Sequence, residues 1–172
     1  MNKTLLCAAF LTVAAAGTAS AGGTPGSVGV GYESSLAEVD VGQFGTFGFG
    51  GVSVNYDGGD FHAGGLVGIA DFGDSNDTDL TLGGRFYWHV GSTGSADFGL
   101  GGALTYATVD DRGNPNGGAS VLYLEPGFQI RAFVVPNVAL SFTGGLVLGA
   151  ADAEGLALTG QATGAAGVHY YF

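Results

Sequence analysis

The sequence predicts an all-β protein, a closed eight-stranded antiparallel up-and-down transmembrane β-barrel. Apolar and polar residues alternate with a period of two along eight segments, which is the pattern of strands with two different faces. Charged residues make up only 11% of the chain, against about 25% in an average globular protein. The chain stops on the stretch GVHYYF, which suits a last strand lying in lipid better than an end that frays in water.

Residues 1–21 have the features of a secretory signal peptide, which is removed from the mature protein. Lys3 provides the positive start, LLCAAFLTVAAAG is an apolar run too short for a spanning helix, and Ala19-Ser20-Ala21 matches a cleavage site. The alternative is an N-terminal helix of the core. The only cysteine, Cys7, lies in this segment, so the mature domain, residues 22–172, is expected to have no thiol chemistry.

Eight segments of the mature chain are expected to be strands. In DLTLGGRFYWHV, for example, Leu82, Phe86 and Trp88 share the apolar face. Most segments contain the roughly 9–11 residues that a tilted transmembrane strand needs. In the second segment the alternation changes phase, which indicates a bulge near Gly50 and Gly51. The eight segments are 26–33, 44–56, 60–71, 79–90, 96–109, 120–134, 138–150 and 156–172.

The connections between these segments alternate in length. DFGDSNDTD and DDRGNPNGG are long, polar and acidic, whereas DGGD, GSTGS and VPN are tight turns. Long loops at one end and short turns at the other are the layout of an outer-membrane barrel. Because the number of strands is even, both termini fall at the short-turn end, which is expected to face the periplasm.

The composition indicates which face of the strands points outward. A soluble, lipocalin-like barrel is the alternative, but its outer surface would need many Lys, Glu and Arg side chains. The polar face here consists mainly of Gly, Thr and Ser, and residues 22–172 contain no lysine. The apolar face is therefore expected to lie outside. Its aromatic residues near the short-turn end, expected to form a membrane-interface girdle, are Tyr56, Phe61, Trp88 and Phe98.

With these features, residues 22–172 resemble the small eight-stranded outer-membrane proteins of the OmpX and OmpA transmembrane-domain type. The resemblance lies in the architecture and in Val168, Tyr170 and Phe172 at the end of the chain. In that family, a final aromatic residue preceded by apolar residues at alternating positions is the signal read by the barrel-assembly machinery. The resemblance implies this role for the three residues. The high content of glycine, 35 residues, departs from the family.

An eight-stranded barrel has an interior that side chains can fill, so charges in the lumen need partners. Turn geometry suggests that Asp97 lies near Arg131, and that Arg85 reaches Glu125 across two glycines of the strand between them. The sequence therefore predicts a lumen network of two buried ion pairs.

No cofactor or metal is expected, and the chain is not expected to be an enzyme. His62 and His89, with Asp97 and Asn55 beside them, form a set that can bind a metal, but polar packing of the periplasmic rim explains it more simply. Outer-membrane enzymes that modify lipids use a histidine and a serine near the outer rim, within hydrogen-bond reach of each other. The three histidines of this chain are expected at the opposite rim.

The sequence thus predicts a non-catalytic barrel of a bacterial outer membrane with an envelope-structural or surface-interaction role, including adhesion. The alternatives are a narrow channel for small solutes and a lipid-modifying enzyme. The expected partners are outer-membrane lipids and lipopolysaccharide, and the barrel-assembly machinery during biogenesis. A net charge of −11 argues against nucleic acid, and a monomer is expected. The acidic loop DFGDSNDTD reads as solvated, with a weak divalent-cation contact as the alternative.

Overall fold

The computed structural model describes residues 24–34, 39–40, 46–47, 50–71, 78–110, 118–151, 155–159 and 166–172. The expected signal peptide lies outside these residues, as does most of each long acidic loop. No helix in the described part of the chain is long and apolar enough to span a membrane. The strands are β1 (Val28–Ser34), β2 (Val39–Asp40), β3 (Thr46–Phe47), β4 (Gly50–Asp57), β5 (Phe61–Asp71), β6 (Thr78–Ser92), β7 (Ala96–Asp110), β8 (Gly118–Val135), β9 (Val138–Ala151), β10 (Gly155–Thr159) and β11 (Ala166–Tyr171).

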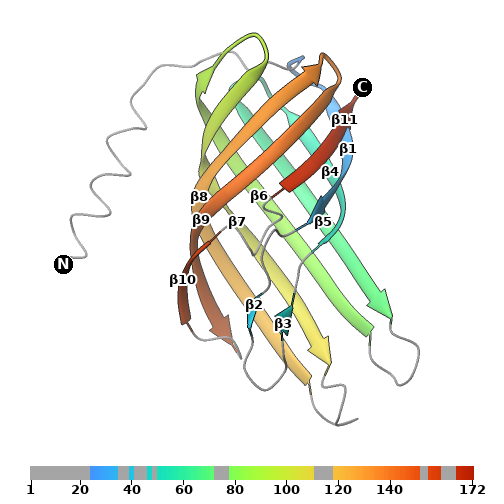
Figure 1. Ribbon diagram of the computed structural model, residues 1–172, viewed down its shortest axis with the longest axis vertical. Helices are drawn as coiled ribbons and strands as arrows, with labels where there is room; N and C mark the ends of the chain where they lie inside the picture. The colour runs from blue at the N-terminus through green and yellow to red at the C-terminus, as the bar shows by residue number, and fades with distance from the viewer. Residues whose placement is uncertain are drawn as a thin grey trace, which may run out of the picture.

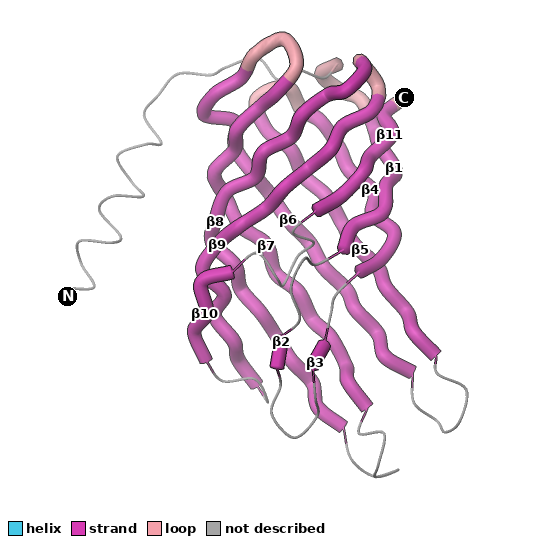
Figure 2. The backbone as a smooth tube through the Cα atoms, in the orientation of Figure 1, coloured by secondary structure: helices cyan, strands magenta, loops and turns pink. Residues whose placement is uncertain are grey.

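Eight of these strands form a closed ring. They follow one another in the order β1–β4–β5–β6–β7–β8–β9–β11, and β11 pairs with β1 to close the ring. Every pairing in the ring is antiparallel. Figure 1 shows the strands slanting around one barrel with the C-terminus at one end, and Figure 2 shows a wall made of strands. The fold is the closed eight-stranded up-and-down barrel predicted from the alternating segments.

The strand registers give the dimensions of the barrel. The row of partners that starts at Ala96 on β7 passes through β8, β9, β11, β1, β4, β5 and β6 and returns to β7 at Tyr106. The displacement along β7 is 106 − 96 = 10 residues. With strands about 4.7 Å apart and about 3.3 Å per residue, this displacement gives a tilt of about 41° and a backbone radius of about 8 Å. Side chains can fill an interior of this size.

The last predicted strand, 156–172, is divided in the structure. Both of its parts, β10 and β11, pair with β9. From Thr159 to Ala166 the chain advances by 166 − 159 = 7 residues, while their partners Gly145 and Phe142 are only 145 − 142 = 3 residues apart. The pairings of β10 and β11 with β9 are therefore out of step with each other, where one continuous strand was expected, and residues 160–165 of that prediction lie outside the described residues.

The second predicted strand, 44–56, also comprises two elements. The ring strand β4 begins at Gly50, whereas β3 pairs with β2 in a separate two-stranded sheet. The change of phase in the alternation thus coincides with a change of sheet, where a bulge near Gly50 and Gly51 was expected.

The burial of side chains is inverted relative to that of a soluble protein. Polar side chains fill the lumen, and Arg131, His62 and Glu33 are each 0% exposed. Large apolar side chains lie on the outside, among them Leu104 and Leu124, each 50% exposed. The apolar face of the alternating pattern therefore points outward, as the composition indicates.

Candidate functional site in the lumen and on the outer face

Five side chains from five strands meet in the lumen near the short turns; we call Arg131, Asp57, Asp97, His89 and Tyr171 the Arg131 cluster. Arg131 Nε and Nη2 donate to the two carboxylate oxygens of Asp97 at 3.0 and 2.8 Å. Nη2 also donates to Asp57 Oδ2 at 2.9 Å, and Nη1 donates to the hydroxyl of Tyr171 at 3.0 Å. Bidentate hydrogen bonds between ions are the strong kind. The pairing of Asp97 with Arg131 expected from the sequence is present, and a second carboxylate joins it.

The turn DGGD positions two members of this cluster. Gly59 has a φ of 86°, which glycine adopts without steric cost, and its N–H donates to Asp57 Oδ1 at 2.8 Å. His89 Nδ1 lies 2.7 Å from the carbonyl oxygen of Gly59, to which it donates. His89 Nε2 lies 3.2 Å from Arg131 Nη2 and accepts from it in the tautomer that carries its proton on Nδ1.

A second group, the Arg85 cluster, comprises Arg85, Glu33, Asn55, His169 and Ser141. Both terminal nitrogens of Arg85 donate to the carboxylate of Glu33, and Nη2 also donates to Asn55 Oδ1 at 2.6 Å. Asn55 Nδ2 donates to His169 Nδ1 at 2.9 Å, so the ring proton is on Nε2, which donates to Ser141 Oγ at 2.7 Å. The cluster connects β6, β1, β4, β11 and β9.

The predicted pairing of Arg85 with Glu125 is wrong, because Arg85 binds Glu33. In the row of strand partners, Arg85 has Ala103 on one side and Gly64 on the other. Ala103 stands between Arg85 and Glu125, whereas Gly64 has no side chain, and a Cβ there would lie 3.1 Å from Arg85 Nε. The guanidinium therefore extends across Gly64 toward β4 and β1. Glu125 is fully buried elsewhere in the lumen.

The hydrogen bond between Ser141 and His169 resembles half of a nucleophile–base pair, but both side chains are buried in the lumen. His169 is 0% exposed and Ser141 is 5% exposed. A Cβ added to Gly167 would lie 2.8 Å from His169 Nε2 and 2.9 Å from Ser141 Oγ. The space above Gly167, next to both side chains, is therefore too small for a methyl group.

His62 and His89 both lie in the lumen, as expected, but they are not brought into a metal site. Within the described ranges, no group of three or more His, Cys, Asp or Glu side chains is arranged to hold a metal ion. The two ring nitrogens of His62 have no hydrogen-bond partner among the described residues. The ring is fully buried and fills space between the wall strands.

The aromatic residues expected at the membrane interface do lie on the outer face. Tyr56, Trp88 and Phe98 are 42%, 43% and 37% exposed. Phe61 lies between its neighbours, with its ring centroid 6.3 Å from that of Trp88 and 5.3 Å from that of Phe86. These residues gather near the short turns that connect β4 to β5 and β6 to β7.

Sequence reasoning missed a second aromatic group on the same face. Phe98 stacks on Phe128, and Phe128 packs against Phe142, with centroid distances of 5.9 and 6.2 Å. The signal was present in the sequence, because Phe128 and Phe142 occupy outward positions in the alternation of their strands. Together the two groups continue the belt across β4 to β9.

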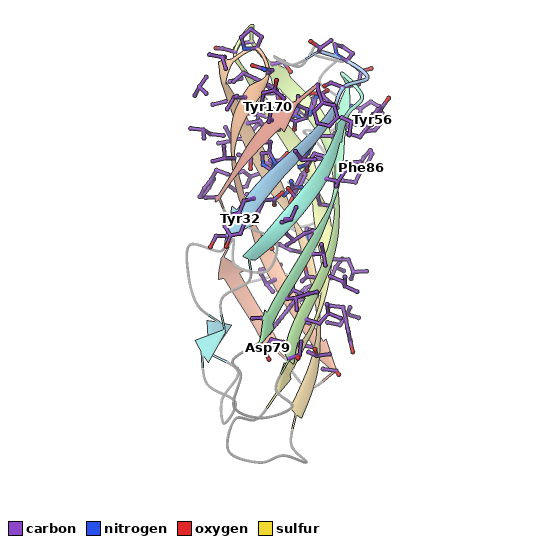
Figure 3. All side chains as sticks on the ribbon, turned by 90° about the vertical axis from the view of Figure 1, so that its right-hand side faces the viewer. Tyr32, Tyr56, Asp79, Phe86 and Tyr170 are labelled. Carbon is purple, nitrogen blue, oxygen red and sulfur yellow. The ribbon has the colours of Figure 1, made fainter. Side chains whose placement is uncertain are left out.

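The three residues of the expected assembly signal also point outward. Val168, Tyr170 and Phe172 are 53%, 50% and 71% exposed. Figure 3 places Tyr170 and Tyr56 toward one end of the barrel and Asp79 at the opposite end. The terminal strand therefore presents an apolar outer face, while His169 and Tyr171 reach into the two lumen clusters.

A closed eight-stranded barrel with a filled polar lumen and an apolar outside has the architecture of the small membrane-spanning barrels. Among solved structures, the chain is similar to the crystal structure of Ail, the attachment invasion locus protein of Yersinia pestis, with 12% sequence identity and a TM-score of 0.42. That similarity covers 86% of this chain and 95% of that chain. No family model and no curated protein matches the chain.

Proposed function

We propose that the chain is a non-catalytic barrel of a bacterial outer membrane, with a structural role in the envelope and, through its loops, a role in interactions at the cell surface such as adhesion. One observation carries this proposal, the inverted burial of side chains. Outward residues such as Ile69, 70% exposed, and Val54, 56% exposed, form an apolar surface far too extensive for a protein in water. Hydrocarbon covers such a surface without cost.

The lumen supports a role without conduction or catalysis. A backbone radius of about 8 Å leaves no open channel once side chains point inward. Arg131 and Arg85 extend across the interior and bind partners on other strands. The outer-membrane lipids and lipopolysaccharide are the proposed surroundings of the outer face, and the barrel-assembly machinery is the proposed partner of the terminal strand in a monomeric protein.

The test of location and closure is gel migration of the full chain from separated membranes of a Gram-negative host. We expect the protein in the outer-membrane fraction, with a band that changes its migration on boiling because a closed barrel resists detergent. A protein recovered from the soluble periplasmic fraction would refute the proposal. In planar bilayers we expect no stepwise conductance, and reproducible single-channel steps would favour the narrow channel instead.

The surface role is tested separately on whole cells. Cells that carry the protein should bind immobilised extracellular-matrix protein more strongly than cells without it. The matched control replaces only residues 72–77, between β5 and β6, by a short Gly-Ser turn, so that the paired residues of both strands are kept. This variant should lose the effect. Equal binding by all three strains would contradict adhesion while leaving the structural role in place.

A further inference from the structure

The seam at which the barrel closes has an unusual pattern of side-chain sizes. On the lumen face, β1 and β11 are joined by three successive pairs, Gly29 with Tyr171, Gly31 with His169, and Glu33 with Gly167. Each pair combines a glycine with a large side chain. The glycine lies on β1 in the first two pairs and on β11 in the third. Of the other pairs in this ladder, Val30 with Tyr170 and Tyr32 with Val168 point outward and combine large residues on both strands.

The large side chains of these pairs occupy the space above the glycines. A Cβ added to Gly29 would lie 2.8 Å from Tyr171 Cδ1. A Cβ on Gly31 would lie 2.5 Å from His169 Nδ1, and one on Gly167 would lie 2.8 Å from Glu33 Cγ. Real Cβ atoms do not approach so closely, so each large side chain fits only opposite a glycine.

The sizes of the paired side chains distinguish the native register from slipped registers that keep the same side chains buried. A slip by one residue would turn every side chain to the wrong face, but a slip by two keeps the lumen and outer faces intact. A two-residue slip in one direction places Glu33 opposite His169, two large groups in one space. A slip in the other direction places Gly31 opposite Gly167 and leaves a void.

Each large side chain of the seam is also held by a lumen cluster. Tyr171 accepts a hydrogen bond from Arg131, and Glu33 accepts from Arg85. His169 is bonded to Asn55 and to Ser141. The two clusters therefore attach the first and last strands to the strands between them, and they do so only in the native register.

We propose that the lumen face of the β1–β11 seam is a register lock, in which side-chain size selects the pairing and the two clusters hold it at closure. Tyr171 and His169 are positioning residues of this lock. The proposal concerns how the ring closes, and it does not depend on any role of the loops at the cell surface.

Cysteine pairs on the outer face report the register, because residues 22–172 contain no cysteine. Val30 pairs with Tyr170 in the native ladder, so the V30C/Y170C protein should form a disulfide on mild oxidation. The pairs V30C/V168C and V30C/F172C report the two slipped registers, and their Cα atoms in the native register are about 7–8 Å apart, too far for a disulfide. In an otherwise unchanged chain, the slipped pairs should crosslink at least tenfold less than the native pair.

The variant that tests the lock is Tyr171→Ala combined with His169→Ala. We expect crosslinking of at least one slipped pair to rise tenfold or more relative to the native pair. The conservative variant Tyr171→Phe keeps the size and loses only the hydroxyl, so it should retain the native register. A folded barrel of the double alanine variant with an unchanged crosslinking ratio would overturn the proposal.

If the double alanine variant yields no folded barrel, a second measurement tests the proposal. The folded yield is scored by heat-modifiable migration. We expect Gly29→Ala to lower this yield at least tenfold more in the chain that keeps Tyr171 than in the chain that carries Tyr171→Ala. Equal losses in both backgrounds would mean that Gly29 and Tyr171 do not fit each other as proposed, and the lock would be refuted.

Discussion

Replacement of Arg131 by methionine tests the energetic role of the Arg131 cluster. Methionine keeps the length of the side chain but removes the cation, leaving Asp57 and Asp97 buried at 0% and 3% exposure. Removal of one partner from a buried ion pair costs about 3–5 kcal/mol. Since two carboxylates lose their partner here, we expect Arg131→Met to lower the free energy of unfolding by at least the lower end of that range.

The assay is reversible urea unfolding of the folded barrel in phospholipid vesicles, followed by the fluorescence of the single tryptophan, Trp88. The control carries Asp57→Asn and Asp97→Asn together with Arg131→Met, so that the carboxylates that Arg131 binds are removed along with it. It should recover most of the lost stability, because replacement of a whole buried ion group by uncharged residues often leaves the free energy of unfolding nearly unchanged. The reasoning is refuted if Arg131→Met alone changes the free energy of unfolding by less than about 1 kcal/mol.

Three further predictions follow from the same geometry. Glu33→Gln should lower the free energy of unfolding by about 3 kcal/mol, since it leaves Arg85 without its carboxylate, and an additive effect of Glu33→Gln and Arg85→Met in a double-mutant cycle would contradict the pairing. Gly101→Ala should abolish the folded, heat-modifiable band, because the new Cβ would overlap the carbonyl oxygen of Phe86, whereas Gly84→Ala, with nothing within 4 Å, should fold normally. Leu104→Arg, near the middle of β7, should lower the free energy of unfolding in urea titrations by about 2–4 kcal/mol. Thr78→Arg, at the first residue of β6, should lower it by only about 0–1 kcal/mol. Equal losses would argue against a hydrocarbon belt.

The strands and their faces could be predicted because the alternation is local. Every second residue of a strand points to the same side. The apolar face that includes Leu82, Phe86 and Trp88 can therefore be predicted without knowing which strands lie beside it. The pair of Asp97 and Arg131 could also be predicted, because their strands are consecutive and joined by one hairpin. These features depend on information contained in one or two adjacent segments.

The remaining contacts depend on closure of the ring, which no local pattern encodes. Glu33 lies on the first strand and meets Arg85 in the lumen across two intervening strands, β4 and β5. Tyr171 and Asp57 reach Arg131 from strands that are far apart in the sequence. Arg85 extends toward Glu33 across Gly64, which has no Cβ, whereas Ala103 stands between Arg85 and Glu125.

The central claim is that the apolar face of the strands contacts hydrocarbon and the polar face fills a dry lumen. Trp88 tests it most directly, because it is the only tryptophan and is 43% exposed on the outer face. In vesicles whose acyl chains carry bromine atoms, its fluorescence should be strongly quenched, and aqueous acrylamide should have little effect. Strong quenching by acrylamide with no response to the brominated lipid would contradict the claim.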